Sequence, residues 1–407
     1  MKKLYLYIAA LYLGMFGTYA QNIHQIPSGD TSQYKSRKLH LEEANFVSAY
    51  YHQDGNNSAV TGGIGTEKLT DVANTFDLQL SKYNKQGRKN TFLFELGVDH
   101  YTSASSDKID PNSISSASMS DIRIYPSLNW TLSNEATGNS YGFTGSFSQE
   151  YDYQSVGAGF NLTRLSKDKN RQFDFKLQAF LDTWTVILPV ELRGTNYGSG
   201  AEEDSRSAGT QPRNSFSASF GLSQVINKSL QLELIVEPAY QHGLLATKYQ
   251  RNYFTDGSLR AETLPDNRYK LPIGARLNYF LGDQFVIRTF YRYYMDNWGI
   301  KAHTAELEVP VKLSSFISIS PFYRYNNQKG TRYFAAYGQH DPAAQYFTSD
   351  YDLSTLNSSF YGTGIRFAPP KGVFGWQHLN MLELRYGHYS RSTNLTSNII
   401  SLNLKIK

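Results

Sequence analysis

Apolar and polar residues alternate along most of this chain with a period of two. Between residues 90 and 101, Phe92 and Phe94 share one parity, whereas Thr91 and Glu95 share the other. Successive side chains of a β-strand point to opposite faces, so this alternation predicts strands with one apolar and one polar face. Because the pattern continues to the end of the chain, it predicts an all-β fold.

The alternation predicts sixteen strands. Most of them are about ten to thirteen residues long, the length that a tilted strand needs to cross an outer membrane. We expect strands at 43–53, 70–82, 90–101, 121–132, 141–151, 154–165, 172–183, 214–225, 230–241, 268–281, 285–295, 300–313, 316–326, 358–368, 379–391 and 395–407.

The connections between these strands differ in length in a regular way. Those after even-numbered strands are short and hold turn residues, such as Asn227-Lys228 and Gly282-Asp283. Long extracellular loops and short periplasmic turns are typical of transmembrane antiparallel up-and-down β-barrels, so we expect a barrel of about 16 strands. The long connections follow odd-numbered strands and are 54–69, 102–120, 184–213, 242–267 and 327–357.

The apolar faces of the predicted strands carry almost no charge at their centres. A charged side chain at mid-bilayer costs about 2–4 kcal/mol, so this absence is expected of a lipid-facing surface. A soluble β-sandwich shows the same alternation, but the 31 tyrosines, many of them near strand ends, favour two membrane interfaces. The residues expected to face lipid include Phe94, Leu128, Leu177, Leu234, Leu277 and Leu404.

Composition narrows the possible functions. The mean hydropathy of −0.47 is that of an ordinary soluble protein, but a barrel reaches the same value through its wet interior and polar loops. The chain has no cysteine, which excludes disulfides, thiolate metal sites and cysteine-attached haem. Without Lys2 and Lys3, 38 basic residues face 35 acidic ones, and no basic block suits nucleic acid.

The N-terminus has the pattern of a signal peptide. Lys2 and Lys3 precede an apolar stretch that is too short to span a bilayer, and Ala20 offers a cleavage site. We therefore expect a signal peptide at 1–20, a polar periplasmic leader at 21–40 and an outer-membrane β-barrel at 41–407. The leader is expected to be a disordered arm rather than a segment tucked into the barrel mouth.

Charges of both signs fall on the polar face of three neighbouring strands. Since adjacent strands lie about 4.8 Å apart, these side chains can form a ladder across the lumen. The ladder has two interpretations: a constriction that imposes a transverse field on a solute path, or a salt-bridged plug. Its members are Arg276, Arg288, Arg292, Glu306 and Glu308.

The first long loop offers a possible cation site. Asp54, Asn56, Asn57 and Glu67 lie among several glycines, and oxygen-rich, glycine-rich loops can wrap Ca²⁺. The spacing is not that of an EF-hand, and polar residues are common in loops. Apart from Ca²⁺ in this loop, we expect no cofactor, and the sequence does not identify a metal.

Nothing in the sequence indicates catalysis. No nucleophile elbow, zinc-protease motif or phosphate-binding glycine loop is present. His52 and His303 are the candidate bases for an outer-rim hydrolase, because both fall near the outer ends of strands. We expect that the protein is not an enzyme and that it has no catalytic residues.

Five stretches of the chain resemble one known family. They resemble the bacterial outer-membrane family catalogued as domain of unknown function thirty-five-seventy, from about Leu41 to Lys407. The resemblance implies a β-barrel without an established activity, whose genes often accompany a very small lipoprotein and flavin-attachment or thioredoxin-like proteins. The stretches are YYHQDGNNSAVTGGIGTEKLTD (50–71), YTSASSDKI (101–109), FLDTWTVILPVELRG (180–194), ETLPDNRYKLPIGARLNYFLGDQFVIRTFYRYYMDNWGIKAHTAELEVPVK (262–312) and FTSDYDLS (347–354).

Two functional hypotheses follow. In the first, the barrel is a scaffold or conduit for a partner, such as a small lipoprotein or redox carrier, as the long aromatic loops and the resemblance favour. In the second, it is a porin-like channel for a small solute, which a polar lumen favours. Outer-membrane lipid is an expected partner in both cases, and nucleic acid is not.

Overall fold

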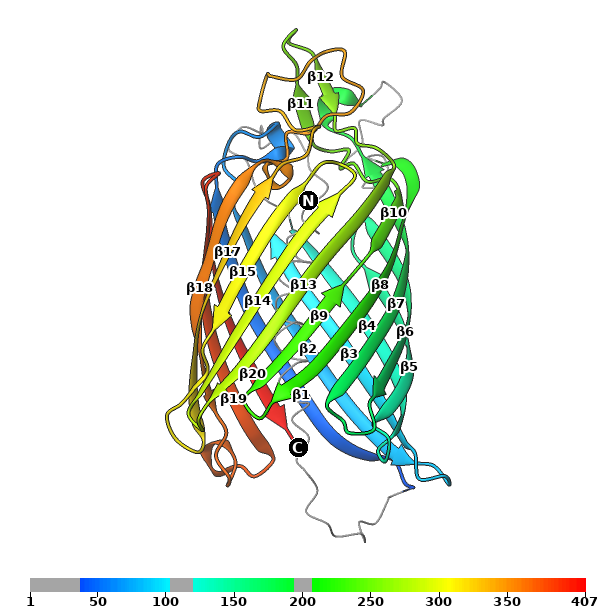
Figure 1. Ribbon diagram of the computed structural model, residues 1–407. Coiled ribbons are helices and arrows are strands. Elements are labelled where there is room, and N and C mark those ends of the chain that lie inside the picture. Colours follow the sequence, from blue (N-terminus) through cyan, green and yellow to red (C-terminus); the bar gives the residue numbers. More distant parts are fainter. Residues whose placement is uncertain (1–36, 103–119, 194–206) are drawn as a thin grey trace.

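The computed structural model describes residues 37–102, 120–193 and 207–407 (Figure 1). The predicted signal peptide at 1–20 and most of the leader at 21–40 lie outside these residues. None of the described residues forms a helix that is long and apolar enough to cross a membrane. The short 3-10 turns of the described loops are Ala59–Thr61, Val190–Leu192, Tyr351–Leu353 and Val373–Gly375.

The described residues fold into one closed antiparallel β-barrel (Figure 1). Neighbouring positions of the wall are filled in chain order, and β1 pairs with β20 to close the wall, with Phe46 opposite Leu404. The wall strands are β1 (His40–Gly55), β2 (Leu69–Tyr83), β3 (Lys89–Thr102), β4 (Ser120–Asn134), β5 (Asn139–Gln149), β6 (Tyr153–Leu165), β7 (Arg171–Ile187), β8 (Ser207–Asn227), β9 (Leu230–Val236), β10 (Ala239–Gly243), β13 (Asn267–Leu281), β14 (Phe285–Asp296), β15 (Lys301–Glu308), β16 (Val311–Lys312), β17 (Ile317–Lys329), β18 (Leu356–Phe367), β19 (Leu379–Arg391) and β20 (Leu395–Ile406).

These segments make sixteen wall strands, as predicted from the alternation. Two of the sixteen are interrupted: β9 and β10 share one position in the wall, and so do β15 and β16. Pro238 lies in the first interruption and Pro310 in the second. Proline has no N–H to donate to a neighbouring strand, so regular pairing stops there and resumes in the same register.

Strand β8 is the largest departure from the predicted boundaries. The prediction began this strand at residue 214, whereas β8 begins at Ser207, which pairs with Ile187 of β7. The added residues are small or polar and show no alternation. Pairing above the membrane needs no apolar face, so the periodicity gave no sign of this extension.

The two ends of the barrel differ, as predicted. The turns after β2, β4, β6, β8 and β13 are short and lie at the end that also holds the C-terminus (Figure 1). The opposite end carries the long described loops, including a hairpin of β11 (Arg251–Tyr253) and β12 (Leu259–Ala261). Three connections at this end are nevertheless short, at 150–152, 297–300 and 392–394.

The apolar residues at alternate positions of each strand face outward. Leu128 is 52% exposed, and Phe94, Leu177 and Leu234 are also exposed. Leu277 shares its parity with exposed Ile273, and Leu404 shares its parity with exposed Ile400. All six residues predicted to face lipid therefore lie on the outer surface, which has the apolar character of a membrane-spanning barrel.

Adjacent residues of β4 provide a test of this orientation. Arginine at Leu128 should impair assembly by about 2–4 kcal/mol, because it would place a charge against lipid. Arginine at Asn129, whose side chain faces the lumen and donates to Thr144, should be tolerated. Urea unfolding of the two variants in lipid vesicles measures the difference, and equal stabilities would contradict the assigned faces.

Candidate functional site

The predicted lumen charges form separate ion pairs rather than one ladder. Arg288 lies 3.6 Å from Glu308 of the next strand. Arg276 instead pairs with Glu233 of β9 at 2.6 Å, and Glu306 pairs with Arg324 of β17. Arg292 lies on the same inward face, opposite Gly274 and Thr304. The predicted residues thus share the lumen face but take their partners largely from outside the predicted set.

Arg385 of β19 is a lumen residue that the sequence analysis missed. Its guanidinium lies 3.3 Å from Glu308 and 3.2 Å from Glu383, and it stacks over Phe322 at 5.4 Å. A side chain on Gly364 would meet the Arg385 Cγ at 3.0 Å, so the glycine leaves room for this reach across β17 and β18. The alternation of β19 alone predicts that Arg385 points inward. No sequence pattern, however, indicates that its partner lies three strands away.

A compact set of carboxylates lies at the outer rim between β4 and β6. Ligand oxygens of Asp121, Glu150 and Asp152 all lie within 4.8 Å of one another. The Tyr101 hydroxyl donates to Glu150 at 2.6 Å, and the Arg123 Nε lies 3.7 Å from the same carboxylate. Three clustered carboxylates are a donor set that a hard cation such as Ca²⁺ accepts.

The long outer loops are tied together into what we call the outer cap. The backbones of Thr263 and Phe347 donate to each other at 3.3 and 2.8 Å, and Thr255 donates to the His340 carbonyl at 3.0 Å. Figure 1 shows these loops gathered at the loop end of the barrel. The cap consists of the described residues 56–68, 188–193, 244–266 and 330–355.

An apolar core joins the outer cap to the ends of the wall strands. This core joins the ends of β6 and β7 to the β14–β15 connection, which lies several strands further round the wall, so it bridges part of the mouth. A second cluster, of Val60, Ile187 and Tyr249, joins the β1–β2 loop to β7. The main cluster consists of Tyr153, Trp184, Val186, Leu244, Leu245, Ala246, Leu264, Trp298, Ile300 and Leu353.

Arg251 fastens three loops of the cap to one another. Its guanidinium forms two parallel hydrogen bonds to Glu191, at 3.1 and 2.8 Å, and a third at 2.9 Å to the Val60 carbonyl. Arg251 is buried, and such bidentate pairs fix geometry as well as adding energy. Burial raises the pKa of Glu191, but the Arg251 hydrogen bonds, a backbone hydrogen bond and the positive charges of Arg251 and Arg193 together outweigh burial and lower that pKa.

Buried carboxyl groups lie inside the cap. Glu262 accepts from the Thr247 backbone and from the Thr348 hydroxyl, both at 2.5 Å. Burial raises the pKa of Glu262, against these hydrogen bonds. Burial, together with neighbouring Asp352 and Glu262, also raises the pKa of Asp350. Ionising either group therefore opposes the packing of the cap.

The predicted loop cation residues do not converge in this structure. Asp54 is exposed and lies 4.0 Å from the Lys68 amine. Asn57 donates to the Thr393 carbonyl, and Asn56 is exposed. Glu67 is buried on the inner side, where its Oε2 lies 3.2 Å from the position of a side chain on Gly55. Calcium binding by these four residues stays a prediction.

The two histidines considered as bases lie on the outer surface. Each shares its parity with an exposed tyrosine, His52 with Tyr50 and His303 with Tyr291. His52 contacts the Thr70 hydroxyl at 3.0 Å, and His303 contacts the Tyr291 hydroxyl at 2.7 Å. Both rings therefore lie on the outward face of the wall rather than beside the lumen carboxylates.

The chain belongs to the family described as "Protein of unknown function (DUF3570)", which matches it over residues 95–392. No curated protein matches it.

Several solved structures have a similar arrangement at low sequence identity. OccK7 (OpdD) of Pseudomonas aeruginosa is 9% identical, with a TM-score of 0.38 over 90% of this chain and 98% of that one. CdiB of Acinetobacter baumannii is 10% identical, with a TM-score of 0.43 over 90% and 60% of the two chains. A mutant ferric enterobactin receptor, PfeA, of Pseudomonas aeruginosa is 11% identical, with a TM-score of 0.45 over 86% and 53%.

Charge reversal in the lumen tests the ion pairs. Arg385→Glu sets a third carboxylate beside Glu308 and Glu383, and should cost up to about 3 kcal/mol, the lower end of the range for breaking a buried pair. Arg288→Glu should cost less, because the Arg288 side chain is 42% exposed and better screened. Heat-modified gel mobility reports both losses, with Arg385→Met as the uncharged control. A larger loss in Arg288→Glu would contradict the assigned pairs.

Acid should loosen the cap through Glu191. Because the folded pKa of Glu191 is lowered, its stabilising effect is present above the ordinary glutamate pKa of about 4.3 and is lost as pH falls through the lowered value. Hydrogen exchange in residues 250–262, corrected for intrinsic rates, should therefore rise below about pH 4. Glu191→Gln should exchange faster at pH 7 and lose this acid step. Glu262 and Asp350 act in the opposite direction, since burial raises their pKa values and protonation at low pH favours their packing. An unchanged acid step in Glu191→Gln would therefore contradict the role of Glu191.

Proposed function

We propose that this protein is an outer-membrane barrel of a Gram-negative bacterium that holds a partner, such as a small lipoprotein or redox carrier, on a scaffold with a closed outer mouth. The observation that carries this proposal is the outer cap. Its loops are joined by backbone hydrogen bonds, by an apolar core and by the Arg251 ion pair. A cap that packs on the strand ends through an apolar core is a fixed surface, and fixed surfaces suit recognition of a partner.

The lumen supports the same proposal. Its charges are largely paired between neighbouring strands, as with Arg276 and Glu233 or Arg324 and Glu306. Paired charges present little net field to a passing solute, whereas a selective constriction separates the two signs across its path. The pairs therefore serve the stability of the wall more than they serve selection of an ion.

A porin-like channel is the second candidate. A sixteen-stranded barrel is wide enough for an aqueous path unless its own residues fill it, and the Arg288 side chain is 42% exposed. In this case the cap would act as a gate over the lumen. A hydrolase has less support, because His52 and His303 face away from the lumen.

Single-channel conductance in planar bilayers separates these candidates. The purified barrel, freed of co-purifying proteins, should show little steady current. Arg251→Ala removes the contacts to Glu191 and Val60, so it should produce frequent open events. Arg171→Ala, which removes an exposed arginine at the opposite end, is the matched control and should stay closed.

A steady, ion-selective current through the wild-type protein that persists when co-purifying proteins are added back would reject the scaffold and favour the channel. Current that falls when they are added back would instead reject closure by the cap alone and show that a bound partner closes the mouth. Closed behaviour of the Arg251→Ala variant would mean that the cap is not what closes the mouth.

A further inference from the structure

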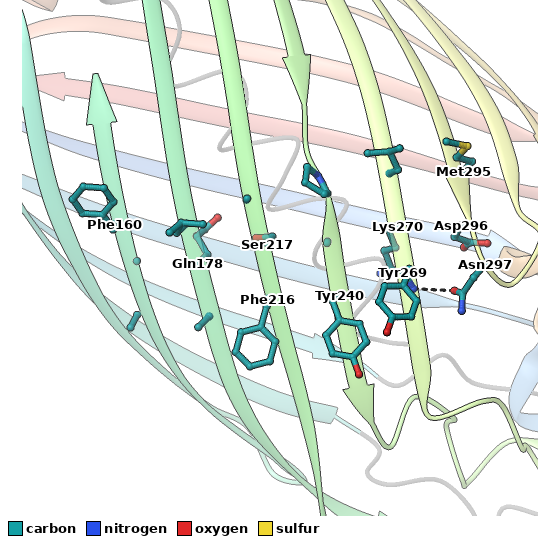
Figure 2. Close-up of a pocket in the computed structure, with 18 residues that line it drawn as sticks. Phe160, Gln178, Phe216, Ser217, Tyr240, Tyr269, Lys270, Met295, Asp296 and Asn297 are labelled. Atoms are coloured by element: carbon teal, nitrogen blue, oxygen red, sulfur yellow. Dashed lines mark hydrogen bonds between the residues drawn. The ribbon is translucent and has the colours of Figure 1, made fainter. Parts of the chain in front are cut away.

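The outer surface of the wall is hollowed between β6 and β14 (Figure 2). The hollow has a volume of about 980 Å³ and is mainly apolar. Two rows of directly opposed, outward-facing residues form it. The row nearer the loops is Ala158, Ala179, Phe216, Tyr240 and Tyr269. The row nearer the bilayer centre includes Phe160, Leu177, Ala218, Leu271 and Met295.

Small residues on a surface of large ones create the hollow. Ala218 lies opposite Leu177, and its backbone donates to the Pro238 carbonyl at 3.0 Å, so an alanine and a proline adjoin in the floor. Leu177 and Phe216 rise beside them and are each more than 40% exposed. The floor is therefore recessed relative to its rim.

The edge of the hollow nearest the loops is polar. The Tyr240 hydroxyl donates to Asn267 at 2.7 Å, and His242 contacts the same amide at 3.1 Å. Tyr240 and Tyr269 stack at 4.7 Å, side by side in Figure 2. Tyrosines with exposed polar ends mark the level of the lipid headgroups in membrane barrels. The hollow therefore begins at that level and extends toward the bilayer centre.

We propose that this hollow binds an acyl chain of an outer-leaflet lipid, with the headgroup of that lipid against Tyr240, His242 and Asn267. The position of the hollow in the apolar belt brings it into contact with lipid chains. A polypeptide would have to satisfy its own backbone there, and the side chains of both rows below the tyrosines offer no hydrogen-bond partner. An acyl chain has no such need, and it fills a recess that a flat surface would lack.

The proposal rests on the membrane location proposed above but not on the closure of the mouth. A barrel that conducts ions would retain the hollow unchanged. The conductance experiment therefore tests the closed mouth, the lipid-retention experiment tests the hollow, and either proposal can be rejected without the other.

Lipid retention by the purified protein tests this site. Wild-type barrel and variants are extracted from native membranes, exchanged into the same detergent and weighed with bound lipid by native mass spectrometry. Ala218→Phe and Ala179→Phe fill the floor and should each reduce retained lipid about ten-fold. Ala305→Phe is the matched control, because Ala305 is exposed on the same apolar face but outside the hollow. Heat-modified mobility confirms that each variant is folded.

A second measurement identifies what occupies the hollow. In vesicles containing a phospholipid with a photoreactive acyl chain, crosslinks should map to the peptides around Ala218 and Leu271, and Ala218→Phe should abolish them. Equal lipid retention in Ala218→Phe and Ala305→Phe would overturn the proposal. A wild-type dimer that Ala218→Phe converts to a monomer would also overturn it, since the occupant would then be a second copy of this chain.

Discussion

A bilayer core cannot satisfy backbone hydrogen bonds, and the wall of this protein follows from that constraint. An unpaired N–H or carbonyl group costs several kcal/mol in hydrocarbon, so a sheet that spans the membrane must leave no edge. The pairing of β1 with β20 removes the edge. Closure then fixes the two faces, because the parity that meets lipid must be apolar and the other parity is enclosed. Interruptions at Pro238 and Pro310 are tolerated because the register continues past each of them.

Closure of sixteen strands also encloses the inward-facing polar and charged side chains. Charged side chains enclosed by the wall need partners, and several here take their partner from a neighbouring strand or across a small residue. Arginine suits this role better than lysine, since its planar group can pair with a carboxylate while it stacks on a ring. Arg276 does so with Glu233 and Phe290, and Arg385 with Glu308 and Phe322. The rings of the lumen thus hold the cations in place.

The sequence predicted the parts of the structure that the bilayer dictates. Period-two alternation placed the sixteen strands and the outward position of Leu128 and Leu404, because lipid imposes that pattern on each strand separately. The cap escaped prediction for the opposite reason. Arg251 meets Val60, 191 residues earlier in the chain, and no local pattern records a contact between loops. The loop cation residues were grouped by closeness in sequence, but Asp54 is exposed on β1 whereas Glu67, in the loop before β2, is buried.

Features that the bilayer does not require are therefore the places where this chain differs from an average barrel. Lipid would accept a large apolar residue at Ala158, Ala179 and Ala218, so three alanines that meet in one recess are not explained by the membrane constraint. The same reasoning applies to the cap, where buried Arg251 and Glu262 serve no requirement of the bilayer. Because the wall needs neither feature, both are free to carry function, one toward the lipid and one toward the outside. The barrel supplies a rigid frame that keeps these two surfaces in a fixed relation.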